Sequence, residues 1–173
     1  MTQTPQEQHS EHHLLTNAYS ELVKQETLWQ TNLIAAISSV IACGRDHLQT
    51  ARARAWLFND DKTTLSCSTL IDEQGSHTEP DIRLSIDEHP EYFGALQAFR
   101  VIASSNAQTD PNARCFLETN SRSPSISAIL DAALVKEGET FGTLCFEHID
   151  SERQWHSEEI NFATSLADLI AQL

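Results

Sequence analysis

The chain has 173 residues, of which 40% are hydrophobic and 21% charged, and this suits a single folded domain. Its 11 Lys and Arg against 25 Asp and Glu give a formal net charge of −14, so we expect no binding to nucleic acid or to anionic lipid. No apolar stretch reaches the roughly 20 residues of a membrane span, and no N-terminal segment joins a positive start to an apolar core. We therefore expect a cytoplasmic protein whose four cysteines are free thiols.

The N-terminal quarter predicts a disordered stretch followed by one long helix. Residues 1–13 are polar and show no periodicity, which is typical of a disordered terminus. In residues 14–44, apolar side chains recur at spacings of three, four and seven, and Gly44 ends the pattern. A second apolar flank indicates two packing neighbours, the domain's own sheet and a second chain, so we expect this helix to serve in dimerisation. Residues 45–173 then form the core domain.

The first half of the core domain predicts a hairpin, a third strand and a helix. The β-prone runs 51–59 and 64–72 flank a short polar segment and predict a β-hairpin. A short strand is expected at 80–85. The helix that follows has Asp87 as its expected N-cap. Its apolar face consists of Tyr92, Phe93, Leu96 and Phe99.

The second half of the core domain contains the most apolar segments. A short strand is expected at 101–104, and a short helix at 113–119 follows a loop rich in turn formers. Residues 125–136 and 140–149 flank a tight turn and predict two central strands that are buried on both faces. A final helix begins at Ser157 and continues its apolar stripe to the end of the sequence.

Five segments carry a family resemblance: RARAWLF (52–58), YFGALQAFRVIA (92–103), TDP (109–111), ISAILDAALV (126–135) and FGTLCFEHIDSERQWHSEEINFATSLADLI (141–170). They resemble the bacterial GAF domains attached to histidine kinases and diguanylate cyclases. The resemblance covers residues 30–173. It implies an α+β fold in which a central antiparallel sheet has the first and last helices on one face. Short helices and loops then cover a ligand cavity on the other face.

The resemblance also implies a role and partners. We expect a non-catalytic sensory domain of a two-component or cyclase signalling chain, which binds a small molecule or a partner. It would form a homodimer through its terminal helices and act on a C-terminal output domain, a kinase or a cyclase. The alternative is a purely structural role, in which the chain is a dimerisation domain with a filled interior and binds no ligand.

The better-known ligands of the family are not expected here. The chain lacks the Asn-Lys…Phe…Asp-Glu pattern of cyclic-nucleotide phosphodiesterase GAF domains, so cyclic GMP and cyclic AMP are not supported. Cys115 falls about where bilin-binding relatives link their chromophore, but Phe116 follows it where those relatives have His. We therefore expect no covalent bilin and no other cofactor.

The candidate ligand cavity lies on the sheet face opposite the terminal helices. Such sites are mostly apolar with a few polar groups. These side chains either surround a small molecule or fill the space themselves, and both alternatives stay open. The candidate lining residues are Tyr92, Phe93, Leu96, Ile102, Phe116, Ser127, Ile129 and Cys145.

An enzyme of the free methionine sulfoxide reductase kind is the catalytic alternative. It would use Cys67, Cys115 or Cys145, and its chemistry requires exposed thiols of low pKa that lie near one another. Cys67 and Cys145 fall in apolar strands, so we expect no catalytic residues. His12 and His13 belong to the polar terminus together with His9, and no metal site is expected there.

Two further features are expected to be structural. Asp131 stands in an apolar strand as a candidate buried acid, which would need an Arg or backbone donors as its partner. The resemblance places Glu147 and His148 at the end of the last strand, near Arg153 and Trp155, and we expect these four residues to form one structural cluster.

Overall fold

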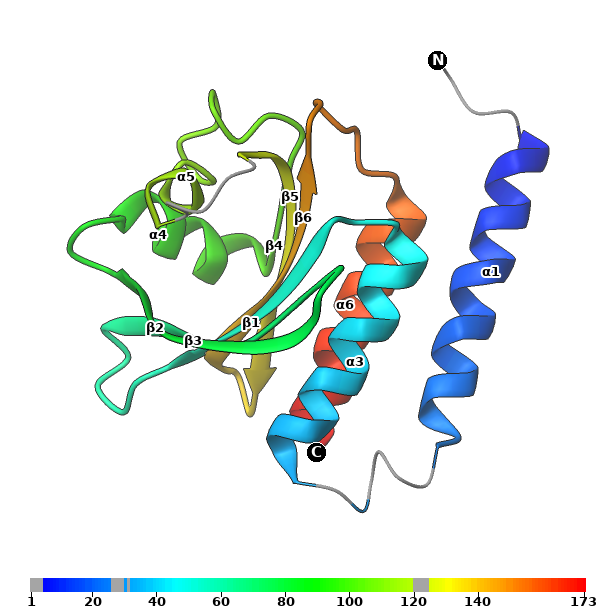
Figure 1. Ribbon diagram of the computed structural model, residues 1–173, viewed down its shortest axis with the longest axis horizontal. Helices are drawn as coiled ribbons and strands as arrows, with labels where there is room; N and C mark the ends of the chain where they lie inside the picture. Colours follow the sequence, from blue (N-terminus) through cyan, green and yellow to red (C-terminus); the bar gives the residue numbers. More distant parts are fainter. Residues whose placement is uncertain (1–4, 26–29, 31, 120–124) are drawn as a thin grey trace.

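The computed structural model describes residues 5–25, 30, 32–119 and 125–173. Within these ranges, the sheet lies between two layers of helices (Figure 1). The elements in chain order are α1 (Pro5–Val23), α3 (Leu33–Leu48), β1 (Arg52–Phe58), β2 (Thr64–Asp72), β3 (Gly75–Ser85), α4 (Pro90–Phe99), β4 (Val101–Ser104), α5 (Cys115–Thr119), β5 (Ile126–Lys136), β6 (Glu139–Ile149) and α6 (Ser157–Gln172).

The middle layer is one antiparallel sheet of six strands in the order β3-β2-β1-β6-β5-β4. β5 and β6 are neighbours, joined by a tight turn in which Glu137 and Gly138 both have positive φ. Two-residue turns with positive φ at both positions match the twist of the strands they join. The predicted pair of core strands and the α+β class are confirmed.

The terminal helices lie together on one face of the sheet, as expected (Figure 1). α3 and α6 pack directly on the strands, and α1 packs on both helices. Their core includes Leu130 and Leu134 of β5 and Phe146 of β6. Gly44 of α3 allows this close packing, because a Cβ atom there would lie 2.4 Å from the Phe146 ring.

The short helices α4 and α5 cover the opposite face of the sheet. α4 begins at Pro90 with His89 as its N-cap, so the expected N-cap at Asp87 is wrong. The fixed φ of proline suits the first turn of a helix, which explains the later start. Tyr92, Phe93 and Leu96 of the predicted apolar face are buried, but Phe99 is 70% exposed.

The N-terminal helices differ from the expected pattern. α1 begins at Pro5, within the stretch expected to be disordered, because its buried Leu15 and Leu22 pack against the other terminal helices. The helix expected over 14–44 is not continuous. The Asn32 side chain accepts a hydrogen bond from the Ala35 amide at 3.0 Å and starts a new helix, α3, which passes Gly44 and ends at Leu48. No helix in the described ranges combines the length and hydropathy of a membrane span.

Candidate functional site

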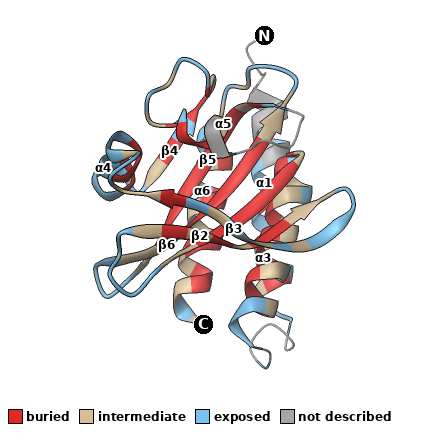
Figure 2. Cartoon of the chain, turned by 60° about the vertical axis from the view of Figure 1, so that its left-hand side comes forward, coloured by how far each residue is buried: buried red, intermediate tan, exposed pale blue. Residues whose placement is uncertain are grey.

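The candidate cavity residues meet between the sheet and α4 and α5. Seven of the eight belong to one hydrophobic cluster that α4, α5 and the inner sheet face build together. Ser127 is half-buried and lies outside that cluster. Figure 2 shows the buried residues running through the middle of the sheet beneath these helices. We call this side of the sheet the inner face.

Aromatic side chains dominate the inner face. Trp56, Phe58, Tyr92, Phe93 and Phe116 form what we call the aromatic cluster. Ring centroids lie 5.1 Å apart for Tyr92 and Phe116, and 5.9 Å apart for Trp56 and Phe116, in edge-to-face geometry. Trp56 was not among the expected lining residues. Trp56 and the buried Arg54 are, however, two positions apart on β1, so both side chains point to this face.

Asp131 is a fully buried acid on the inner face, on β5 beside the edge strand β4. The Tyr92 hydroxyl donates a hydrogen bond of 2.7 Å to its Oδ2 atom, so the partner is a phenol of α4 and not the expected Arg or backbone donors. Its Oδ1 atom has no hydrogen-bond partner among the described residues. Burial raises the pKa of Asp131 to about 7, although Cys145 and Tyr92 act to lower it. This carboxyl therefore changes its charge near neutral pH.

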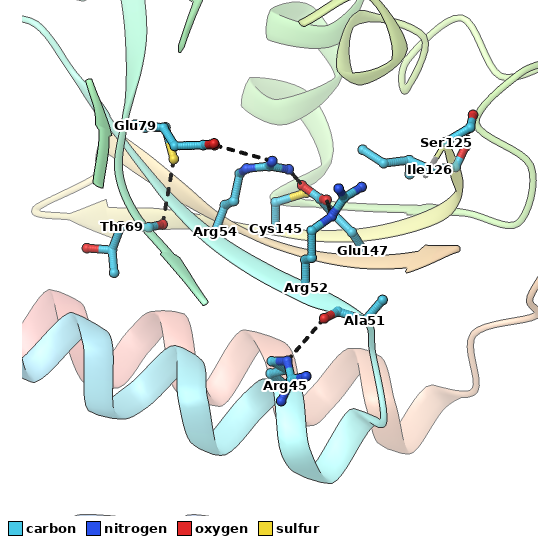
Figure 3. Close-up of polar contacts among 11 residues, drawn as sticks. Arg45, Ala51, Arg52, Arg54, Thr69, Glu79, Ser125, Ile126, Cys145 and Glu147 are labelled. Atoms are coloured by element: carbon cyan, nitrogen blue, oxygen red, sulfur yellow. Dashed lines mark hydrogen bonds and ion pairs between the residues drawn. The ribbon is translucent and has the colours of Figure 1, made fainter. Parts of the chain in front are cut away.

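A second buried polar group consists of Arg52, Arg54, Glu79 and Glu147, which we call the ionic cluster (Figure 3). Glu147 is 0% exposed and accepts from Arg52 Nε at 2.8 Å and, over a short contact, from Arg54 Nη1. Arg54 Nη2 also lies 3.4 Å from Glu79 Oε2. Burial acts to lower the pKa of Arg54, but Glu147 raises it above its ordinary value. Glu147 therefore favours the charged form of Arg54.

The expected cluster of Glu147, His148, Arg153 and Trp155 is divided between two places. Adjacent residues of a strand point to opposite faces, so Glu147 joins the ionic cluster while His148 lies 3.4 Å from Ser151 Oγ. The Arg153 guanidinium stacks 4.3 Å from the Trp155 ring centroid and donates to the Leu48 carbonyl at 2.7 Å. Trp155 in turn donates to the Ser104 carbonyl at 3.1 Å. These bonds join the end of α3 to the loop before α6.

The four cysteines are free thiols, as expected. Cys67, Cys115 and Cys145 are buried on the inner face. Burial raises the pKa of Cys67 to about 12 and that of Cys145 well above its ordinary value. Thiol chemistry requires the opposite, an exposed sulfur of low pKa. No three His, Cys, Asp or Glu side chains of the described ranges come together as metal ligands.

A hollow of about 500 Å³ lies on the other side of the molecule, between α1 and α3. Its walls include Leu14 and Leu22 of α1 and Cys43 and His47 of α3. Nothing in the sequence pattern singled out this hollow. It lies beside the terminal helices and not at the inner face, where the candidate cavity was expected.

Comparison with known proteins gives the family. Residues 32–173 match the model described as GAF domain. No match to the sequence was found among curated proteins. The fold is similar to the GAF domain of a phosphoenolpyruvate-protein phosphotransferase from Coxiella burnetii, with a TM-score of 0.70 and 17% identity over 94% of this chain and 90% of that one.

Two photoreceptor structures are also similar. The phytochrome photosensory core module of Stigmatella aurantiaca matches with a TM-score of 0.69 and 13% identity, over 99% of this chain and 37% of that one. The blue-light-absorbing form of the Thermosynechococcus elongatus PixJ GAF domain matches with a TM-score of 0.60 and 19% identity, over 86% and 90%. At these identities the structures support the fold alone, and the match of the family model over residues 32–173 decides the membership. The chain belongs to the GAF domain family.

Proposed function

We propose that this GAF domain is a non-catalytic sensory domain. A small molecule binds at the inner face, and the bound state reaches the terminal helices of a homodimer through the sheet. The output domain, a kinase or a cyclase of a cytoplasmic signalling chain, lies beyond α6 in this proposal. The observation that carries it is the way in which β5 and β6 contribute to two different cores.

Alternate residues of these strands face opposite layers. Leu130 of β5 and Phe146 of β6 pack under α3 and α6, whereas Ile129 and Cys145, their neighbours in sequence, pack under α4 and α5. Protein cores are close-packed and transmit small displacements. A ligand that shifts the strands at the inner face therefore changes the packing of the terminal helices on the other face.

A second copy of the chain is the partner that the terminal helices fit best. Four large hydrophobic side chains are exposed in the described ranges, and three of them, Leu14, Leu33 and Ile34, lie on α1 and α3. The fourth, Phe99, lies on α4. Leu14 also borders the hollow between α1 and α3. Burying these side chains together with the hollow would remove apolar surface from water in a symmetric dimer.

Sedimentation velocity of the full chain tests the dimer. We expect the unmodified protein and the matched control Phe99→Glu to sediment as dimers at high micromolar concentration. The double variant Leu14→Glu, Ile34→Glu should sediment as a monomer, because it places charge in the interface. A monomeric unmodified protein would refute the dimer and the relay that depends on it.

The relay is tested with the dimer dissociation constant of Tyr92→Phe. This change removes the hydrogen bond between α4 and Asp131 at the inner face without touching α1 or α3. Coupling between two sites of a protein is typically worth about 5- to 150-fold in affinity. We expect a change of at least about fivefold. An unchanged constant would refute transmission through the sheet while leaving the dimer in place.

The packed aromatic cluster favours a second candidate, a dimerisation domain whose interior is filled. Its rings already lie in favourable contact with one another. This candidate predicts a dimer that no inner-face variant or small molecule alters. The sulfoxide reductase alternative is disfavoured by the burial and raised pKa of Cys67 and Cys145, and a turnover assay with free methionine sulfoxide checks it.

A further inference from the structure

We propose that the ligand of the inner face is an organic cation that carries an N–H donor, with Asp131 as its anchor and the aromatic cluster as its surroundings. The inference rests on the proposed function and names the chemical class of the ligand at that same site. Three features of the inner face support it: an oxygen atom without a partner, the absence of a facing cation among the described residues, and the rings.

The first feature is the Asp131 carboxyl itself. It is 0% exposed, and only Oδ2 is satisfied, by the Tyr92 hydroxyl at 2.7 Å. Oδ1 is buried and lacks a hydrogen-bond partner in the part of the chain that the structure describes. The thiol of Cys145, the residue paired with Asp131 on β6, lies 4.0 Å from Glu147 Oε1 and also interacts with the Asp131 carboxyl, but it does not reach Oδ1 at hydrogen-bond distance. A buried oxygen of this kind costs free energy until a donor reaches it.

The second feature is the charge around the carboxyl. The groups that face it are the Tyr92 hydroxyl of α4 and the Cys145 thiol and Glu147 carboxylate of β6, and none of them is a cation. On the edge side, β4 pairs Ile102 with Asp131, and Cys115 of α5 faces Tyr92. A positively charged ligand would therefore supply the partner cation that the ionised Asp131 carboxyl lacks.

The two buried arginines of the inner face already pair with acids. Arg54 lies between Glu147 and Glu79, with which it makes two ion pairs. The ionic cluster as a whole holds two cations and two anions, so it offers an anionic ligand no excess of positive charge. The net charge of −14 also favours the approach of cations over anions.

The third feature is the rings beside the carboxyl. Tyr92 carries both the hydroxyl that binds Asp131 and a ring that meets Phe93 and Phe116 at centroid distances of 5.4 and 5.1 Å. Aromatic faces attract organic cations, and more strongly where water is excluded. Trp56 stands next to Phe116 and has a buried Nε1 donor without a partner among the described residues. The N–H donor of a flat cation would satisfy the Asp131 oxygen while the neighbouring rings contact its face.

Three matched probes test the charge of the ligand: benzamidine, benzamide and benzoate, which are a cation, a neutral amide and an anion of nearly equal shape. Calorimetric titration of the full chain at pH 8 should show benzamidine binding at least tenfold more tightly than benzamide, with no binding of benzoate. The affinity for benzamidine should fall about tenfold from pH 8 to pH 6, because Asp131 takes up a proton over that range.

Variants assign the effect to the proposed anchor. Asp131→Asn should lower the affinity for benzamidine at least tenfold and erase its advantage over benzamide. Asp168→Asn removes an exposed acid that pairs with Arg100 on the surface, and it should leave the binding of all three probes unchanged. Should Asp131→Asn not fold, the pH dependence of the unmodified protein still decides the question.

Several outcomes would overturn the inference. They are equal binding of benzamide and benzamidine, a preference for benzoate, an affinity for benzamidine that does not change with pH, or no binding of any probe. Binding of the neutral or anionic probe alone would refute a cationic ligand but would not contradict the proposed function. The proposed function fails by a different measurement, the dimer dissociation constant of Tyr92→Phe, which requires no probe.

Discussion

Asp131→Asn should make the protein more stable above neutral pH. The substitution keeps the shape of the side chain and an oxygen that accepts from the Tyr92 hydroxyl, but it removes the ionisation of a fully buried group. Burial raises the pKa of Asp131 from 3.8 to about 7. Between these values the folded protein holds a proton that the unfolded chain releases. Stability therefore falls as the pH rises through this window and is level above it.

The size of the effect follows from the difference between the two pKa values. That difference is about 3 pKa units, and each unit is worth about 1.4 kcal/mol. The ionised carboxyl thus costs the folded protein roughly 4 kcal/mol above pH 7, as an upper limit. The amide carries no such cost. Near pH 4 the two proteins should have similar stabilities, because the carboxyl is then neutral in the folded state and only partly ionised in the unfolded chain.

Urea unfolding of both proteins from pH 4 to pH 8.5 measures this directly. The difference between the two free energies of unfolding isolates Asp131, because all other carboxyl groups titrate in both proteins. We expect the difference to grow by several kcal/mol from pH 4 to pH 7 in favour of the variant, and then to stay constant. Parallel curves at all pH values would show that Asp131 does not hold its proton in the folded protein.

Two further variants test the packing of the two faces. Glu147→Gln should cost about 3–5 kcal/mol of unfolding free energy, because it leaves two buried guanidinium groups without their shared anion. Lys62→Gln breaks an exposed ion pair and should change little in the same urea titration. Gly44→Ala should cost about 1–3 kcal/mol, because its methyl group would meet the Phe146 ring. Gly94→Ala has open space around it and should stabilise its helix by about 0.5–1 kcal/mol.

The strands could be predicted because their signal is local. The sequence runs that form β1, β2, β5 and β6 are β-prone. A short polar turn separates β1 from β2, and another separates β5 from β6. The helix boundaries depend on tertiary contacts. Gly44 reads as the end of a helix, yet it lies inside α3, where its lack of a side chain lets the helix approach Phe146. At such a position, tertiary packing overrides the low helix propensity of glycine.

The inner face could be predicted only in part. Tyr92 and Cys145 follow from apolar patterning and from the family resemblance, whereas the ionic cluster needs the register of the sheet. Arg52 and Glu147 are 95 residues apart in sequence and become direct partners only because β1 pairs with β6. The alternation of Arg52 and Arg54 along one strand was a visible signal that two cations share a face.

The unequal chemistry of the two faces is itself an argument for function. The core under α3 and α6 is apolar except for Glu159, which pairs with Arg153 at the start of α6, whereas the inner face holds four buried charged residues, Arg52, Arg54, Asp131 and Glu147. Buried ion pairs contribute little to stability, and apolar residues of similar size often serve as well or better. The fold alone therefore gives no reason to gather four such groups under the short helices. A site that must bind a polar ligand does give a reason for these buried charges. A variant whose inner face carries no charges but still binds the ligand would contradict this argument.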